Sequence, residues 1–370
     1  MLWFLSWLVA VELLGLAVLP LAVHLLSRLP DRGYLFAKPL GILVVGHACW
    51  LLGVFGMLRF ERTTVAVLLV VLGVACWTAW GRSSLEHLSS ALPAVWFSEG
   101  LFVLCLAAAA LVRAFNPEIS GTEKPMDFAL LNGIHRSEAL PPEDPWMSGH
   151  SISYYYFGYL LLAMVAKLSA VPASVAYNLG VALAFALLLA GVHSLAFNAL
   201  SVLEVGQRPA ARLVAALLAP LMVGVIGNLE IAFEVLAARG FGDPSFWQWV
   251  GIKGLQPAPE AEGWFPTSHW WWWRASRVIP TIKPDGINEF PYFSFLLGDL
   301  HPHFTALPWG LLAVAFSMAA LTGATVRKPA IDVDWPWVVV PALSLGFLLV
   351  GNSWDFPTYT GLFWLAVLAG

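Results

Sequence analysis

The chain has 370 residues, of which 59% are hydrophobic and only 11% are charged, with a formal net charge of -4 at pH 7. Soluble globular proteins carry about 25% charged residues, so this composition excludes a soluble protein. The small net charge gives no sign of a nucleic-acid partner. The composition predicts a multi-pass protein of the cell (plasma) membrane, with membrane lipid as a partner.

Hydrophobic runs recur at the length that a helix needs to cross a bilayer, about 20 residues. The expected spans are 2–26, 39–58, 64–80, 93–115, 152–171, 173–200, 212–238, 304–322 and 336–352. The first run has no basic segment and no small-residue cleavage site, which predicts a retained helix. A last run begins near Pro357 and is too short to span, which predicts that the chain is truncated at its C-terminus.

These runs predict an all-α fold, a polytopic membrane helical bundle with two large extramembrane loops that carry short interfacial helices. The loops are 116–151 and 239–303. We divide the chain into an N-terminal four-helix membrane region, residues 1–115, and a core membrane domain, residues 116–370. Long loops with polar and aromatic residues are where function is expected.

The topology is predicted from the basic residues of short loops, which favour the cytoplasm. The residues used are Arg28, Arg32, Lys38, Arg208, Arg212, Arg327 and Lys328. They place 239–303 outside, whereas a count of the spans places 116–151 outside and 239–303 inside. We expect the error in 171–211, which is long enough for a short helical pair. We assume that both loops share the outer face, because a joint site requires it.

The first loop contains a predicted amphipathic helix. Pro125 suits the first position of a helix. An apolar stripe follows at Met126, Leu130, Leu131 and Ile134, which suits the membrane interface.

Glu123 and Asp127 flank the start of this helix, beside Lys124. Acids at this place complement the helix dipole. The alternative is that one of them is a general base, with a pKa raised by the low-dielectric interface and tuned by Lys124. We favour the general base and name both acids as catalytic candidates.

Further substrate-binding candidates lie in or just after the first loop. They are Lys124, His135, Arg136, Tyr154, Tyr155 and Tyr156. Tyrosines are common at membrane interfaces, so anchoring competes with stacking on a sugar or a lipid head group. The three tyrosines open the next expected span, and three consecutive phenols point in different directions around a helix, so we expect at most two of them to line one groove.

Arg274 and Arg277 in the second loop are three residues apart, which places both on one side of a helix. Paired guanidinium groups suit a phosphate or diphosphate. The run of four tryptophans at 270–273 would anchor beside them. The alternative is an interfacial anchor whose arginines reach toward water.

A second polar motif in this loop reads Asp299-x-His301-x-His303. It supplies ligands that suit a divalent metal ion. However, Pro302 interrupts it and no further ligand is near in sequence, which favours a hydrogen-bonded cluster or substrate contact. No other cofactor is predicted. Glu289, and Asp355 at a membrane edge, complete the predicted substrate-binding residues.

Five motifs in order resemble one family. They are Glu-Lys-Pro-Met-Asp-Phe at 123–128, Tyr154–Tyr156, Arg277-Val278-Ile279 with Ile287-Asn288-Glu289-Phe290-Pro291, Gly298–His303, and Trp354-Asp355-Phe356-Pro357. They resemble the prokaryotic YYY membrane proteins of Chloroflexi and archaea, catalogued as a domain of unknown function. The resemblance covers most of the chain.

The layout resembles, more weakly, the GT-C glycosyltransferases, which have an acidic first large loop, an interfacial helix and a polyprenyl-phosphate sugar donor. This implies that Glu123 or Asp127 deprotonates the acceptor hydroxyl, and that Arg274 and Arg277 hold the donor phosphate. GT-C enzymes place the acidic loop after the first span, whereas four spans precede it here. Either the first four spans are an addition or the analogy fails.

Three functions remain open at this point. The leading one is a membrane glycosyltransferase that moves a sugar from a polyprenyl-phosphate donor to an outward-facing acceptor. A transporter or channel needs charged or broken helices near span centres, and Pro20, Pro220 and Pro308 form no obvious inverted repeat. A non-catalytic scaffold could use small-residue faces such as Ala107–Ala110, but it leaves the polar motifs unexplained.

Overall fold

The computed structural model describes the chain except residues 207, 256–260, 262, 269–270, 280–285 and 324–333. Within the described residues the protein forms fifteen α-helices, a π-helical turn and a 3-10 helix, with no strand. The all-α prediction is confirmed. The α-helices are α1 (Leu2–Leu26), α2 (Ala37–Val54), α3 (Arg62–Ser89), α4 (Leu92–Phe115), α5 (Lys124–Arg136), α6 (Phe157–Ser169), α7 (Ala173–Val202), α8 (Pro209–Ala215), α9 (Leu218–Leu221), α10 (Glu230–Ala238), α11 (Pro244–Val250), α12 (Pro291–Leu297), α13 (Pro302–Leu321), α14 (Trp335–Gly351) and α15 (Asp355–Ala369).

Among the described residues, seven segments are long and apolar enough to cross a membrane. They are α1, α2, α3, α4, α7, Pro209–Ile226 and α13. Helices α6 and α14 are apolar but shorter. The chain is therefore an integral multi-pass membrane protein, as its composition predicts.

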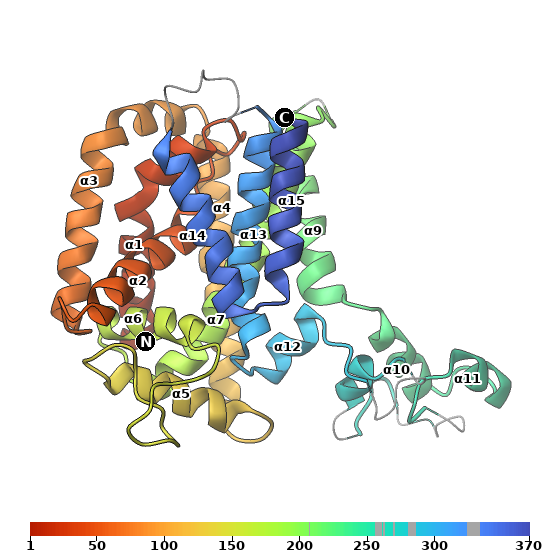
Figure 1. The fold of residues 1–370 in the computed structure, drawn as a ribbon. Helices are drawn as coiled ribbons and strands as arrows, with labels where there is room; N and C mark the ends of the chain where they lie inside the picture. Colours follow the sequence, from red (N-terminus) through yellow and green to blue (C-terminus); the bar gives the residue numbers. More distant parts are fainter. Residues whose placement is uncertain (207, 256–260, 262, 269–270, 280–285, 324–333) are drawn as a thin grey trace. The chain divides into compact units, whose positions relative to one another are not determined.

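The helix α6 does not behave as the predicted span 152–171. Its 13 residues extend about 20 Å, less than the ~30 Å of a hydrocarbon core. Just before it, the Tyr156 hydroxyl accepts a hydrogen bond from Trp50 Nε1, and near its end Lys167 Nζ donates to the Ser137 carbonyl. The segments that follow α2 and α5 are joined to each other, because the Phe60 amide donates to the Glu138 carbonyl at 2.7 Å, and α5 and α6 lie at the same end of the bundle (Figure 1). The chain therefore enters and leaves α6 at one end, and the predicted span is wrong.

When 152–171 is not counted as a crossing, the count of spans places the loop 239–303 outside. The basic residues of the short loops predict the same side for this loop. The error does not lie in 171–211, because α7 is one continuous helix of 30 residues. Arg327 and Lys328 lie outside the described residues. That both large loops share the outer face stays a prediction.

The span predicted at 212–238 is present with different bounds, because the segment long and apolar enough to cross a membrane is Pro209–Ile226 and helical structure stops after it. The π-helical turn Met222–Ile226 is followed by Gly227 with φ 60° and Leu229 with φ 64°. Right-handed helices require negative φ, so α10 starts anew at Glu230.

The chain divides into two compact units. Unit 1 contains Met1–Pro220 and Asp299–Gly370, and unit 2 contains Leu221–Gly298. The predicted division at residue 115 stays a prediction. We describe each unit by itself.

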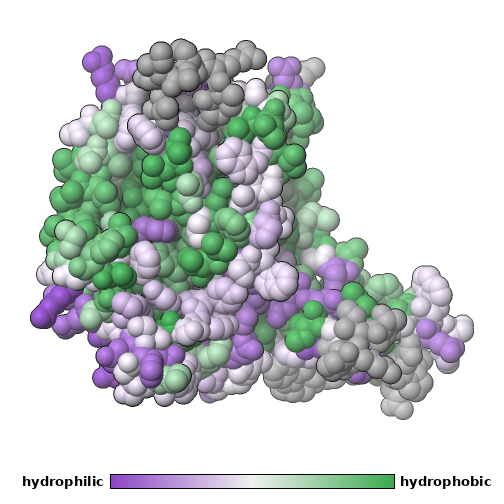
Figure 2. All heavy atoms as spheres, viewed as in Figure 1, coloured by the Kyte–Doolittle hydropathy of each residue, from purple (hydrophilic) through white to green (hydrophobic). Residues whose placement is uncertain are grey.

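Unit 1 is a bundle in which α1 packs on α2 and α3, α4 packs on α7, and α13 packs on α7, α14 and α15. Large apolar side chains are exposed on the outer faces of these helices, for example Val67, Val70 and Val74 on α3. Figure 2 shows hydrophobic residues along the sides of this bundle and hydrophilic residues at its two ends. This distribution suits a bundle surrounded by lipid.

The helices α1 and α2 approach so closely that their contact requires glycine. A Cβ atom at Gly41 would lie 2.1 Å from the Leu14 carbonyl oxygen, and one at Gly15 would lie 3.1 Å from Lys38 Cγ. Small residues allow such close backbone approach between membrane helices. The position of α2 against α1 therefore depends on Gly41.

A buried ion cluster joins α1, α2 and α4. The Lys38 ammonium group pairs with Glu12 and lies 2.9 Å from Glu99 Oε2. The Tyr34 hydroxyl donates to the same Glu99 oxygen at 3.0 Å. Charged groups at membrane depth are costly unless they are paired, so this cluster holds the three helices together.

We predict that Gly41→Ala destabilises the bundle, because the added methyl group must push α1 and α2 apart. Overpacking of this kind costs about 1–3 kcal/mol. Thermal unfolding in detergent should show a lower midpoint. The matched control is Gly100→Ala in α4, where a Cβ atom meets nothing within 4 Å. An unchanged midpoint for Gly41→Ala would contradict the close crossing.

Candidate functional site

A group of ionisable side chains gathers at one end of unit 1. We call it the acid cluster, and it consists of Glu123, Asp127, Asp299, His301 and His303. The first two residues lie at the start of α5, and the other three precede or begin α13. A 2.8 Å hydrogen bond from Thr122 Oγ1 to Asp299 Oδ1 joins the two segments. The structure therefore brings together both catalytic candidates and the whole Asp-x-His-x-His motif.

The amphipathic helix predicted in the first loop is α5. Pro125 lies in its first turn, and Leu130, Leu131 and Ile134 are buried. The same face buries Asp127 completely, at 0% exposure. Its carboxylate accepts a 2.5 Å hydrogen bond from the Tyr159 hydroxyl of α6, while Oδ2 has no hydrogen-bond partner in the described part of the chain.

Burial raises the pKa of Asp127 from 3.8 to about 7. The hydrogen bond from Tyr159 opposes this shift, and the negative charges of Asp299 and Glu123 add to it. Desolvation disfavours the charged carboxylate because the protein interior solvates it less well than water. Asp127 therefore changes its protonation state near neutral pH.

Glu123 differs from Asp127 in being accessible, with a side chain that is 56% exposed. Its Oε2 lies 2.6 Å from His301 Nε2. The His301 Nδ1 atom in turn lies 2.8 Å from His303 Nδ1. In this second contact one Nδ1 atom must carry the proton and donate it. The other Nδ1 atom must be unprotonated and accept it. The three side chains form a continuous path for a proton.

Two cationic side chains, Lys124 and Arg113, border the acid cluster. Lys124 is only 8% exposed, and its pKa is lowered by burial and by Arg113 but raised by Asp299. Burial raises the pKa of Asp299, whereas Thr122 and Lys124 lower it. Acidic and basic side chains are thus both present next to the exposed carboxylate of Glu123.

Sequence reasoning missed three residues next to the cluster, Arg113, Tyr159 and Tyr177. The Tyr177 hydroxyl accepts a hydrogen bond from the Leu300 amide at 3.2 Å, which positions the segment before α13. Arg113 near the end of α4 was a detectable signal, because a basic residue within an apolar run is unusual. The tyrosines lie in apolar runs that gave no signal.

The three consecutive tyrosines line a groove beside the acid cluster. They lie before α6 rather than in it, since α6 begins at Phe157. The groove has a volume of about 610 Å³, and its other walls come from α2 and α14. Tyr154, Tyr155 and Tyr156 all line it, so the prediction that at most two can do so is wrong.

Two hydrogen bonds fix this groove. Tyr156 accepts from Trp50 Nε1, and the Tyr155 hydroxyl lies 2.8 Å from Ser353 Oγ.

Asp355 lies in the first turn of α15, beyond Ser353, and its Oδ2 accepts from Asn352 Nδ2 at 3.0 Å. His303 acts electrostatically on Asp355, so Asp355 borders the cluster.

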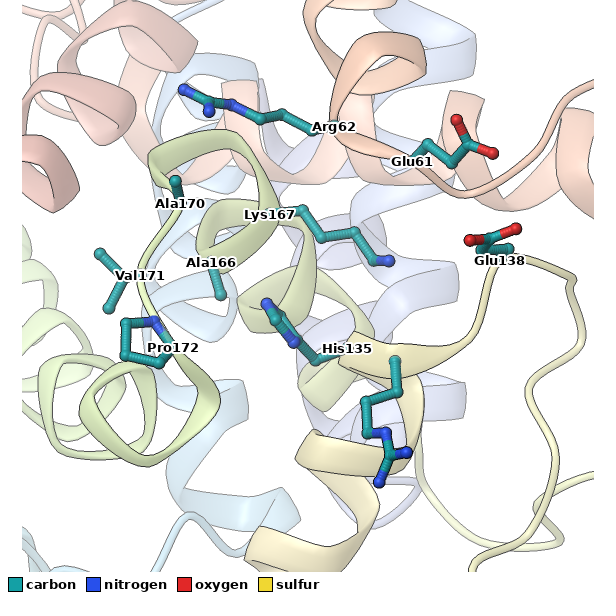
Figure 3. Close-up of a pocket in the computed structure, with 10 residues that line it drawn as sticks. Glu61, Arg62, His135, Glu138, Ala166, Lys167, Ala170, Val171 and Pro172 are labelled. Carbon is teal, nitrogen blue, oxygen red and sulfur yellow. The ribbon is translucent and has the colours of Figure 1, made fainter.

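His135 and Arg136 do not join the acid cluster. They lie in the last turn of α5 and line a different pocket of about 470 Å³. Figure 3 shows His135 beside Lys167, whose side chain extends toward Glu138. Burial and the Lys167 charge lower the pKa of His135. These two residues remain only predicted substrate contacts.

The predicted residues of the second loop lie in unit 2. Arg274 Nε and Nη2 donate to the two oxygens of Glu234 at 2.5 and 2.6 Å. The Arg277 guanidinium lies 4.5 Å from the centre of the Trp273 ring, and Glu289 accepts from Ser294 Oγ at 2.8 Å. The two arginines thus have different partners. Trp270 lies outside the described residues.

The described residues contain no group of three or more His, Cys, Asp or Glu side chains that could hold a metal ion. Asp299, His301 and His303 make separate contacts instead, with Thr122, Glu123 and each other. Both the metal site and the hydrogen-bonded cluster stay predictions for these three residues.

We predict that Asp127→Asn stabilises the protein above neutral pH. The folded-state pKa of Asp127 lies above its unfolded value, so its contribution is complete below pH 3.8 and is lost as pH rises through about 7. At pH 8 the loss amounts to about 4 kcal/mol at most. Asn cannot ionise, so thermal unfolding of the variant should depend less on pH between 4 and 8.

Tyr159→Phe is the matched control for this prediction. It removes a hydrogen bond that lowers the pKa of Asp127, so the pH-dependent loss of stability should move to higher pH. Identical pH profiles for wild type and Asp127→Asn would show that this carboxylate is not buried as described.

One family model matches this chain, over residues 44–370, and its description is "Uncharacterized membrane protein (DUF2298)". The match includes the acid cluster and the tyrosine groove but not Glu12 or Lys38. No curated protein and no solved structure matches the chain. Because the match covers most of the chain, the protein belongs to this family of uncharacterized membrane proteins.

Proposed function

We propose that the protein is a membrane glycosyltransferase of GT-C type, which moves a sugar from a polyprenyl-phosphate donor to an outward-facing acceptor. The observation that carries this proposal is the continuity between the acid cluster and the tyrosine groove at Tyr154. Burial raises the pKa of Tyr154, and the charges of Glu123 and Asp127 raise it further. A ligand in the groove would therefore approach both carboxylates.

The groove suits the lipid part of such a donor. Its walls include Trp50, Phe157, Leu343 and Val350, and Leu343 and Val350 belong to the shorter apolar helix α14. A polyprenyl chain is apolar along its whole length, and aromatic and aliphatic walls exclude water from it. The Tyr154 phenol, on which Glu123 and Asp127 act electrostatically, suits the polar head group.

Glu123 is better placed than Asp127 to be the general base. Its carboxylate is exposed, whereas Asp127 is fully buried. In the proposed step Glu123 takes the proton of the acceptor hydroxyl, and that oxygen forms a bond to the anomeric carbon of the sugar. The bond from this carbon to the donor phosphate breaks, and the polyprenyl phosphate leaves with the electron pair. His301 and His303 carry the proton away from Glu123.

Lys124 is the proposed partner of the leaving phosphate, because it borders the cluster and an ammonium group stabilises developing negative charge. Asp127 acts as a positioning residue that fixes the start of α5 through Tyr159. The resemblance to GT-C enzymes assigns the phosphate to Arg274 and Arg277, but Arg274 already pairs with Glu234. Lys124 therefore carries this role in the proposal.

A transporter is the second candidate, favoured by the buried ion cluster of Lys38, Glu12 and Glu99. Two carboxylates share one ammonium group at membrane depth, and such groups mark ion or proton pathways in many membrane proteins. Uptake of a labelled solute by proteoliposomes, lost in Glu99→Gln, would favour this candidate over the transferase.

The first prediction of the proposal concerns the base. Purified protein in nanodiscs, tested against a panel of polyprenyl-phosphate sugars and acceptors, should transfer sugar, and Glu123→Gln should lower the rate by about 10²–10⁴-fold. Asp127→Asn should also lower it. The matched control is Glu143→Gln, an exposed acid of the same loop, which should retain activity. Full activity of both Glu123→Gln and Asp127→Asn, in folded protein, would remove the mechanism.

The second prediction concerns the groove. A Cβ atom at Gly346 meets nothing within 4 Å, and Gly346 lines the groove, so Gly346→Trp should fill the groove without a clash in the core. We expect a KM at least about tenfold higher for long-chain donors and little change for donors with a short lipid. An equal effect on both donors would show that the lipid chain binds elsewhere.

A further inference from the structure

A third cavity of unit 1 lies where the start of α1, the end of α4 and the start of α7 meet. Its volume is about 560 Å³. Its walls include Trp3, Phe4, Ala110, Val175 and Leu179. It shares no lining residue with the tyrosine groove or with the pocket at His135, so it is a separate site.

One charged side chain, Arg113, lines this apolar cavity. It is 5% exposed, and its Nε donates to Asn178 Oδ1 at 2.9 Å. Asn178 Nδ2 is held in turn by the Pro117 and Ser174 carbonyls, at 3.0 and 3.3 Å. These contacts fix the orientation of the Asn178 amide, because an amide that donates to two carbonyls cannot rotate freely, and the amide oxygen in turn holds Arg113 Nε.

The Arg113 Nη2 atom is buried, and nothing in the described part of the chain accepts a hydrogen bond from it. Arginine stays charged in proteins, so a buried N–H group without an acceptor is costly. Asp299 attracts this charge electrostatically, but its Oδ1 already accepts from Thr122. Because the Arg113 side chain lines the cavity, an anionic group bound there would compensate the charge of the guanidinium group.

The surroundings of the cavity select a lipid rather than a free anion. Trp3, Leu111, Val112 and Phe115 are exposed on the adjoining surfaces of α1 and α4, at the helix ends where a bilayer places its head groups. We infer that this cavity binds an anionic membrane lipid, with a phosphate oxygen on Arg113 and an acyl chain along Phe4, Ala110 and Leu179. This lipid is distinct from the proposed donor.

Native mass spectrometry of the full chain tests this inference. The protein is released from micelles that contain phosphatidylglycerol or phosphatidylcholine, with free inorganic phosphate as a third condition. We expect retained phosphatidylglycerol and little retained phosphatidylcholine, and an excess of inorganic phosphate should not displace the lipid. Arg113→Gln should lower the ratio of lipid-bound to lipid-free protein about tenfold, as expected for one charge-assisted hydrogen bond.

Two further variants keep the test decisive. Val175→Trp fills the apolar part of the cavity while Arg113 remains, and it should also lower lipid retention even where Arg113→Gln fails to fold. The matched control is Arg59→Gln, an arginine outside the cavity with a side chain that is 75% exposed, which should bind lipid like the wild type. Equal retention of the two lipids, or wild-type retention by folded Arg113→Gln or Val175→Trp, would overturn the inference. Because lipid retention is measured without sugar transfer, this result does not depend on the proposed activity.

Discussion

The hydrogen bond from Tyr159 to Asp127 is the contact on which the candidate site depends. Both residues are almost completely buried, so the bond is formed where water does not compete. It ties α5 to α6 and thereby fixes Glu123, four residues before Asp127, at the surface. Asp299 and His301 then complete the site from a segment more than 170 residues away in the chain. A single buried carboxylate thus links local helix geometry to the assembly of a long-range cluster.

Local patterns predicted much of this arrangement, and tertiary effects account for what they missed. The apolar stripe and Pro125 were enough to predict α5, because both signals lie within one helix. The run 152–171 is as apolar as a span, but its helix is held at one end of the bundle by Trp50 and Ser137, which no local pattern reveals. The helix ends before α10 because Gly227 and Leu229 have positive φ angles, and the apolar sequence around them does not reveal this. The pairing of Glu123 with His301 depends on the fold of the whole bundle.

The charges of the protein fall into groups with different surroundings. Lys38, Glu12 and Glu99 are enclosed by helices and serve cohesion among α1, α2 and α4. The acid cluster lies at a bundle end, where Glu123 reaches the surface and Asp127 does not. Arg274 and Glu234 satisfy each other within unit 2. Glu123 is 56% exposed, whereas Glu12 and Glu99 are 25% and 19% exposed, and this difference is why the proposed chemistry is placed at the acid cluster.

The tyrosine groove has a sideways opening, because Ala342 and Val350 of α14 are exposed beside it. A long-chain amphiphile can therefore slide in from the surrounding leaflet without leaving the hydrocarbon. Its search is confined to two dimensions, in which a scarce molecule meets its receptor at a high local density. A modest intrinsic affinity is then sufficient, and in the proposed transfer the product would leave along the same lateral route.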